Sequence, residues 1–225
     1  RMNLLIGSLP VPHVSLIDGI TMGGGVGLSV HGSTRIATEY TTFAMPETQI
    51  GFFCDVGGGY VLPRLPKSMG MWLGLTGARL KGQQVTAAGV ATHLVPREKL
   101  AELEQFLISE ANSGRLNLEN VNSAIDSAFP QDRAAFSASL ADQDAIAHVF
   151  SKPSVHQIYD ALNKMGEPHV EFAERTLAQL NKMSPTSLRV VHRQLVLGAH
   201  LSLEQVLHME QGMSHEMLKQ HDFFE

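Results

Sequence analysis

Glycine is concentrated in the first half of the chain. Of the 20 glycines in this 225-residue sequence, only three follow Gly114. Because glycine adopts backbone conformations that other residues rarely reach, dense glycine is typical of short elements joined by tight turns. The sequence therefore predicts two regions: a glycine-rich part of short strands and helices, residues 1–113, and a mainly helical part, residues 114–225.

The first region alternates strand-type and helix-type segments. The strand candidates share short length, β-branched residues and flanking turn residues; they are residues 13–18, 34–37, 43–45 and 90–95. The helix candidates are residues 23–30, where a loop enters a helix, 68–76, and 83–88, which ends before Gly89. Strands that alternate with helices predict an α/β layer structure.

The second region follows the helical period. Pro96 stands where a first-turn proline belongs, and Leu100, Leu103 and Leu107 then repeat at helical spacing. A polar segment, residues 112–142, contains weaker helical pieces and a break at Pro130. Two later apolar stripes predict two further helices, one at Ala173, Leu177 and Leu180 and one at Leu203, Val206, Leu207, Met213 and Met217.

Two carboxylates stand eight residues apart in the apolar run Phe43–Tyr60, FAMPETQIGFFCDVGGGY. Acids are rarely buried without a partner or a purpose. Glu47 follows the rigid Pro46 among apolar residues, which raise the pKa of a carboxyl toward values useful to a general base. Asp55 precedes Val56 and three glycines, so a helix cap or a turn explains it equally well. The residues alone leave both interpretations open.

A triple glycine, Gly23–Gly25, occupies a strand-to-helix junction. Bare N–H groups at the start of a helix can bind an anion or the oxyanion of an attacked carbonyl. A tight turn with close packing explains the glycines equally well. Two phosphate-binding patterns are excluded, because Val30 breaks GxGxxG and no GxxxxGK[ST] occurs.

Composition and spacing exclude several other classes. An apolar content of 44% and a charged content of 17% indicate a globular protein, and no run reaches the roughly 18 apolar residues of a membrane span. A net charge of −5 without a Lys/Arg cluster argues against a surface that binds nucleic acid. One cysteine, Cys54, excludes an intrachain disulfide and indicates a reducing compartment; its neighbour Asp55 disfavours a thiolate nucleophile.

No metal site is predicted either. The chain has 11 histidines but no HExxH pattern and no Cys/His cluster. His208, His215 and His221 are seven and six residues apart, which does not bring them together as a helical i, i+4 pair would. Surface or core histidines are the expected interpretation for all three.

Three motifs together resemble the crotonase superfamily. They are GITMGGGVGLS, MPET-x-IG-x-F-x-DVGGGY and LTGARLKGQQVTAAGVATHLV, and the similarity continues more weakly to HDFFE at the C-terminus. The resemblance implies a crotonase-type spiral of ββα units, present in part, followed by a mainly helical region. Within the superfamily the motifs are most similar to hydrolases of short 3-hydroxyacyl-CoA thioesters in valine catabolism.

The resemblance also implies roles for three residues. Gly24 matches the glycine whose N–H donates to the thioester oxyanion, Glu47 the general base or nucleophile, and Asp55 the acid that contacts the substrate hydroxyl or orients water. Hydratases of this fold carry a second glutamate two residues after the triple glycine, and Gly27 stands there. Thioester hydrolysis is favoured, because it needs one base and oxyanion stabilisation. Cys54 replaces a proline of the hydrolase pattern.

The resemblance carries further expectations. Family members have a long segment before the position of Arg1, with an AGGD-type loop that donates the second oxyanion N–H, and a tail beyond HDFFE; the chain is expected to be truncated at both ends. The expected partner is an acyl-CoA substrate. No separate cofactor, nucleic acid or membrane is expected, and whether the protein forms a homo-oligomer is left open. The expected location is mitochondrial in a eukaryote and cytoplasmic otherwise. The alternatives are an enoyl-CoA hydratase/isomerase-type enzyme and a non-catalytic scaffold or complex subunit.

Overall fold

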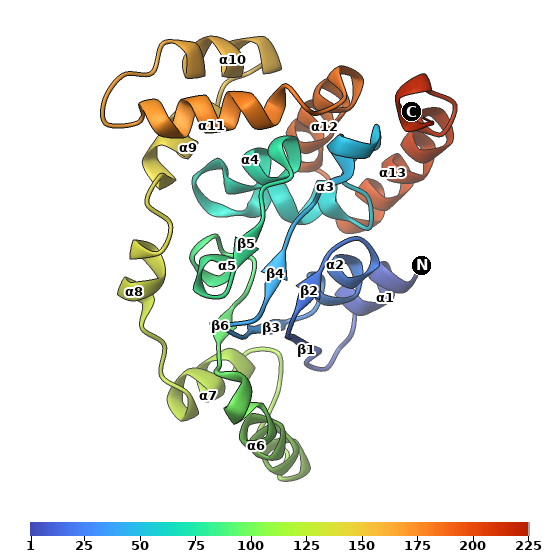
Figure 1. Cartoon of the computed structure of the whole chain (residues 1–225). Helices are drawn as coiled ribbons and strands as arrows, with labels where there is room; N and C mark the ends of the chain where they lie inside the picture. Colours follow the sequence, from blue (N-terminus) through green and yellow to red (C-terminus); the bar gives the residue numbers. More distant parts are fainter. Residues whose placement is uncertain (225) are drawn as a thin grey trace. The chain divides into compact units, whose positions relative to one another are not determined.

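The structure is a computed structural model that describes residues 1–224. The chain forms two compact units that interleave along the sequence (Figure 1). Unit 1 contains Arg1–Phe43 and Leu80–Leu140, and unit 2 contains Ala44–Arg79 and Ala141–Glu225. The boundary predicted near residue 113 lies inside unit 1. The division into residues 1–113 and 114–225 stays a prediction.

Unit 1 holds all the strands of the described chain, in two small sheets. Its strands are β1 Val14–Ile17, β2 Ile20–Thr21, β3 Thr34–Ala37, β4 Thr42–Phe43, β5 Leu80–Lys81 and β6 His93–Leu94. Its α-helices are α1 Met2–Gly7, α2 Gly24–Ser29, α5 Gln83–Ala87, α6 Leu100–Asn112, α7 Val121–Ala128 and α8 Arg133–Ala138, with a 3₁₀ turn at Arg97–Lys99. One sheet has the order β1-β3-β6 and the other β2-β4-β5.

The first sheet is parallel throughout. Val14 pairs with Thr34 and Ile17 with Ala37 across β1 and β3, and β3 continues to β6. The strand predicted at residues 34–37 is confirmed. The strand predicted at 90–95 is shorter, because the N–H groups of Val90 and Ala91 both turn back to the carbonyl of Val85.

An apolar cluster packs the helices of unit 1 against this sheet. Its buried members are Ile36, Val95, Leu103, Val121, Ile125 and Phe129. They come from β3, α6, α7 and the segments beside them, which are distant in sequence. The helix predicted from Leu100 onward is confirmed as α6, but Pro96 lies in extended backbone before a 3₁₀ turn and not in the first turn of the helix.

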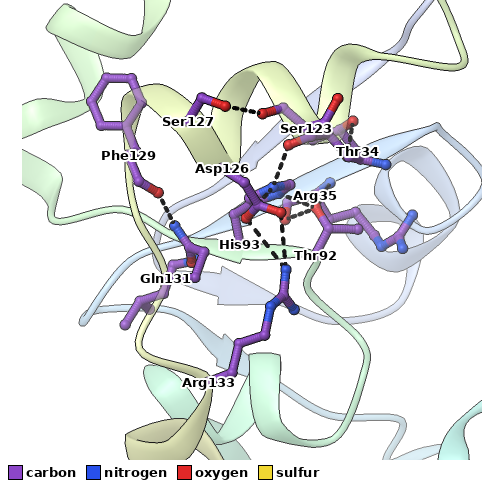
Figure 2. A network of polar contacts seen from close by, with 12 residues as sticks. Thr34, Arg35, Thr92, His93, Ser123, Asp126, Ser127, Phe129, Gln131 and Arg133 are labelled. Atoms are coloured by element: carbon purple, nitrogen blue, oxygen red, sulfur yellow. Dashed lines mark hydrogen bonds and ion pairs between the residues drawn. The ribbon is translucent and has the colours of Figure 1, made fainter.

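A polar network around the buried His93 joins β6 to α7 (Figure 2). The ring of His93, whose side chain is 2% exposed, lies 3.4 Å from the carboxylate of Asp126 and 2.8 Å from the hydroxyl of Thr92. Arg133 pairs with the other oxygen of Asp126 at 3.1 Å. Burial lowers the pKa of His93, and the charge of Asp126 opposes that effect.

Unit 2 is helical. Its α-helices are α3 Gly58–Val61, α4 Met69–Thr76, α9 Gln143–Phe150, α10 Val155–Asn163, α11 Val170–Leu180, α12 Pro185–Gly198 and α13 Leu203–Met217. Its 3₁₀ turns are Glu47–Ile50, Leu62–Arg64, Pro66–Ser68 and His221–Phe223. Helices α3 and α4 pack against α12, and α13 packs against α3. Within residues 1–224, no helix combines the length and apolarity needed to cross a membrane.

Serine caps set where the later helices begin. Ser184 precedes Pro185 at the start of α12 and accepts from the N–H of Ser187 at 3.0 Å. Ser202 forms a reciprocal capping box with Gln205 at the start of α13. These caps set the first residue of two helices that contact the segment between β4 and β5, which contains the candidate site.

Candidate active site

Glu47 opens a 3₁₀ turn, Glu47–Ile50, in unit 2. Its side chain is buried, with the residue 6% exposed. Within residues 1–224, Oε2 of this carboxylate has no hydrogen-bond partner. A buried polar oxygen without a partner is costly and calls for an explanation, which a substrate or a reacting water would supply.

The turn that carries Glu47 is held from several sides. The carbonyl of Thr48 accepts from the N–H of Ser184 at 3.0 Å, and the hydroxyl of Thr48 donates to the carbonyl of Leu75 at 3.3 Å. Gly51 closes the turn in the left-handed region, and the backbone of Asp222 lies where a β-carbon would stand. The C-terminal turn His221–Phe223 therefore packs directly on the turn that holds Glu47.

The environment of Glu47 raises its pKa to about 7. Burial is the largest cause, its own backbone N–H acts in the opposite direction, and the negative charge of Asp55 raises the pKa further. A carboxylate with a pKa near the working pH is suited to general-base catalysis.

Asp55 lies close enough to repel Glu47 electrostatically, so the structure brings the two predicted acids together. Asp55 is partly buried, and burial raises its pKa while its own backbone N–H lowers it. It stands at the start of a tight turn, in which the N–H of Gly58 donates to the Asp55 carbonyl at 2.8 Å. Asp55 thus forms the turn that the sequence allowed, and its role as an acid that contacts the substrate stays a prediction.

A third acid, Glu210 of α13, reaches the same loop and is absent from the predicted site. Its carboxylate accepts from the N–H of Gly57 at 2.7 Å and of Gly59 at 3.0 Å. One sequence signal could have found it: Glu210 falls at helical spacing between Val206 and Met213, as an acid on the apolar face of α13.

Cys54 is fully buried beside these acids. Burial raises the pKa of its thiol, and the charges of Glu47, Glu210 and Asp55 raise it further. Since the thiolate is the nucleophile, these surroundings agree with its exclusion as a nucleophile.

Gly24 belongs to unit 1, where it is the first residue of α2. Within residues 1–224 no hydrogen bond occupies its N–H, as expected at the start of a helix. An added β-carbon at Gly24 or Gly25 would meet no atom within 4 Å, so this backbone borders open space. Gly27 is buried in the same helix. The oxyanion role of Gly24 stays a prediction.

Two other constellations carry no comparable chemistry. In the part of the chain that the structure describes, no group of three His, Cys, Asp or Glu residues could hold a metal ion. The His93–Asp126 pair lies near two serines (Figure 2), but Ser123 donates its hydroxyl to the carbonyl of Asn120 and Ser127 donates to Ser123. The network therefore joins elements and contains no activated nucleophile.

Comparison with known proteins supplies the context for this site. The family described as enoyl-CoA hydratase/isomerase matches residues 1–225. A protein of Xenopus laevis named "3-hydroxyisobutyryl-CoA hydrolase, mitochondrial" is 48% identical over 227 residues, which cover 100% of this chain and 57% of the relative. The Homo sapiens protein of the same name is 46% identical over 226 residues, with the same coverage. The chain thus spans 57% of the length of these two curated relatives.

Among solved structures, an enoyl-CoA hydratase from Rhodobacter sphaeroides 2.4.1 has a TM-score of 0.78 and 34% sequence identity. The match covers 99% of this chain and 61% of that one. Together with the family match, it confirms the predicted α/β fold of crotonase type.

Proposed function

The chain belongs to the enoyl-CoA hydratase/isomerase family, and on that premise we propose that the protein hydrolyses 3-hydroxyisobutyryl-CoA to 3-hydroxyisobutyrate and CoA. The names of the relatives from Xenopus laevis and Homo sapiens support the substrate and the reaction. Those names also support a mitochondrial location, and the reaction would belong to valine catabolism. CoA enters as part of the substrate, and the proposal includes no separate cofactor.

One observation carries the proposal. Glu47 presents a buried carboxylate oxygen without a hydrogen-bond partner in residues 1–224, and its pKa is raised to about 7. A carboxylate that keeps a lone pair free and titrates near neutral pH has the properties of a general base. Asp55, its electrostatic neighbour, is the second acid that the reaction would use.

In the proposed reaction, Glu47 removes a proton from water while the water oxygen bonds to the thioester carbonyl carbon. The N–H of Gly24 donates to the oxyanion that forms. Collapse of this intermediate breaks the C–S bond, and the proton passes to the CoA sulfur. A second route stays open, in which the carboxylate of Glu47 attacks the carbonyl first and water then hydrolyses the mixed anhydride. Asp55 contacts the substrate hydroxyl or orients the water.

Hydration of an enoyl-CoA is the second candidate, because a solved relative with 34% identity is named an enoyl-CoA hydratase. Adding water across a double bond needs two placed proton-transfer groups. At the position where hydratases of this fold carry the second glutamate, this chain has Gly27, which has no side chain. Hydrolysis is therefore favoured over hydration.

The test measures both reactions on the same protein. 3-Hydroxyisobutyryl-CoA is incubated with the 225-residue chain and with a version extended at its N-terminus, and thiol release is recorded. Crotonyl-CoA is incubated in parallel, and loss of the enoyl absorbance is recorded. Thiol release with little hydration is the expected result. Hydration without thiol release from either version would overturn the proposal in favour of a hydratase.

A further inference from the structure

Asp55 begins a turn with unusual backbone geometry. Val56 has a φ of 53° and Gly57 a φ of 84°, so both central residues are left-handed, and the N–H of Gly58 closes the turn on the Asp55 carbonyl. Glycine adopts this conformation freely, but a β-branched valine is strained there. A turn of this kind persists only where its surroundings determine it strongly.

The carboxylate of Glu210 supplies part of that determination. Its Oε2 accepts from the N–H of Gly57 at 2.7 Å, and its Oε1 accepts from the N–H of Gly59 at 3.0 Å. Both donors lie just after Val56. Hydrogen bonds to a carboxylate are stronger than those between neutral groups, so these two bonds help to offset the strain at Val56.

Gln194 of α12 connects Glu210 to the other side of Asp55. Its Nε2 donates to Oε1 of Glu210 at 3.1 Å and to the carbonyl of Cys54 at 2.7 Å. Because both neighbours are acceptors, the orientation of the amide is determined. Glu210 and Gln194, here called the clamp, therefore hold the backbone on both sides of Asp55.

The clamp fits its loop closely. Glu210 is 5% exposed and Gln194 is 2% exposed. A β-carbon on residue 59 would come within 2.9 Å of Nε2 of Gln194 and 3.1 Å of Oε1 of Glu210. Glycine at position 59 is thus explained by the approach of these two side chains.

Packing alone does not account for an acid at position 210. Among residues 1–224 no ion pair neutralises Glu210, and burial raises its pKa to about 7. The N–H groups of Gly57 and Gly59 lower the pKa, and the charge of Asp55 raises it. If the side chain at position 210 only filled space, an apolar residue would cost less free energy to bury than an acid.

We propose that Glu210 and Gln194 are positioning residues, which hold the loop Cys54–Gly59 so that the carboxylate of Asp55 keeps one orientation toward the substrate. This inference rests on the proposed function, because it assigns Asp55 to the substrate. The hydrogen bonds of the clamp to this loop all go to backbone atoms, so we expect it to act on the reaction by fixing the orientation of Asp55.

The first experiment tests the clamp without using activity. Amide hydrogen exchange is measured by NMR for Gly57 and Gly59 in the unmodified protein, in Glu210→Ala and in the isosteric Glu210→Gln. The expected result is about 10- to 100-fold faster exchange at these two amides, with the amides of α4 unchanged. Glu204→Gln removes an exposed acid from the same helix and serves as the control. Unchanged exchange at Gly57 and Gly59 in both Glu210 variants would overturn the clamp.

The second experiment is a double-mutant cycle on thiol release from 3-hydroxyisobutyryl-CoA. Glu210→Gln is expected to lower kcat about 10- to 100-fold in the unmodified background and less than about threefold in an Asp55→Asn background, because the clamp acts through Asp55. Equal losses in both backgrounds would indicate a merely structural role and overturn the proposal. If neither the 225-residue chain nor its N-terminally extended version releases thiol, the proposed function fails, while amide exchange still decides whether the clamp holds the loop.

Discussion

The backbone carbonyl of Asp222 lies where a β-carbon on residue 51 would stand. Gly51 also has a φ of 69°, so two separate constraints require glycine at this position. Through this contact the C-terminal turn His221–Phe223 supports the turn that carries Glu47. A second link joins the same segment to α12, since the hydroxyl of Ser184 donates to the carboxylate of Asp222.

Gly51→Ala is expected to lower the free energy of unfolding by about 3 kcal/mol, because it adds a steric clash to the cost of a left-handed alanine. Urea denaturation measures the change. Gly114→Ala is the control, since Gly114 has a φ of 71° but open space around a β-carbon; it is expected to cost about 1 kcal/mol. Equal costs at the two positions would show that Asp222 does not crowd Gly51.

Glu47→Gln is expected to stabilise the fold at pH 8 by on the order of 2 kcal/mol and to change it little at pH 5. The pKa of Glu47 is raised from 4.5 to about 7 in the folded state, so the folded protein binds its proton more tightly. The stability from that proton is present below pH 4.5 and is lost as the pH rises through 7. Urea denaturation at pH 5 and pH 8 measures the free energy of unfolding of the variant relative to the unmodified protein, with the exposed Glu204→Gln as control. A Glu47→Gln variant that changes this free energy equally at both pH values would contradict the account.

His93 is expected to make the fold sensitive to acid. Burial lowers its pKa below 6.5 in the folded state, so the unfolded chain binds the proton more readily. Its contribution is intact above pH 6.5 and is lost as the pH falls through the lowered pKa. Between pH 7 and pH 5, the free energy of unfolding should therefore decrease less for His93→Gln than for the unmodified protein. For the exposed His200→Gln it should decrease as much as for the unmodified protein. Parallel losses in all three proteins would refute this role for His93.

Gly24→Pro is expected to lower kcat for thiol release about 10²- to 10³-fold, the usual value of one oxyanion donor. Proline removes the N–H and is tolerated at the first position of a helix, which Gly24 occupies in α2. Gly24→Ala keeps the N–H and adds a β-carbon in open space, so its kcat should stay within about fivefold. Circular dichroism checks that both variants fold. Similar kcat values for the two variants would show that the N–H is not a donor.

Local patterns were sufficient to predict several elements. The strand at residues 34–37 needed only its β-branched residues, and the helices α6, α11 and α13 needed only their apolar period. The two-residue strands β2 and β5 could not be predicted, because pairing with β4 defines them rather than their own sequence.

The candidate site was predictable only where a local pattern marks it. Glu47 and Asp55 stand out in an apolar run, but the clamp joins residues 140 to 153 positions apart in the chain. A single sequence carries no record of such a contact beyond an acid on the apolar face of α13. The left-handed Val56 was equally hidden, since valine does not favour that conformation.

The most direct test of the central claim is the rate of thiol release from 3-hydroxyisobutyryl-CoA by Glu47→Gln, compared with the unmodified protein across pH 5 to 9. The account predicts a loss of about 10²- to 10⁴-fold at pH 8. It also predicts that the unmodified rate falls below a pH of about 7, where Glu47 is protonated, and that the variant lacks this fall. A Glu47→Gln variant that keeps its rate within tenfold, or keeps the same acid limb, would contradict the assignment of Glu47 as the base.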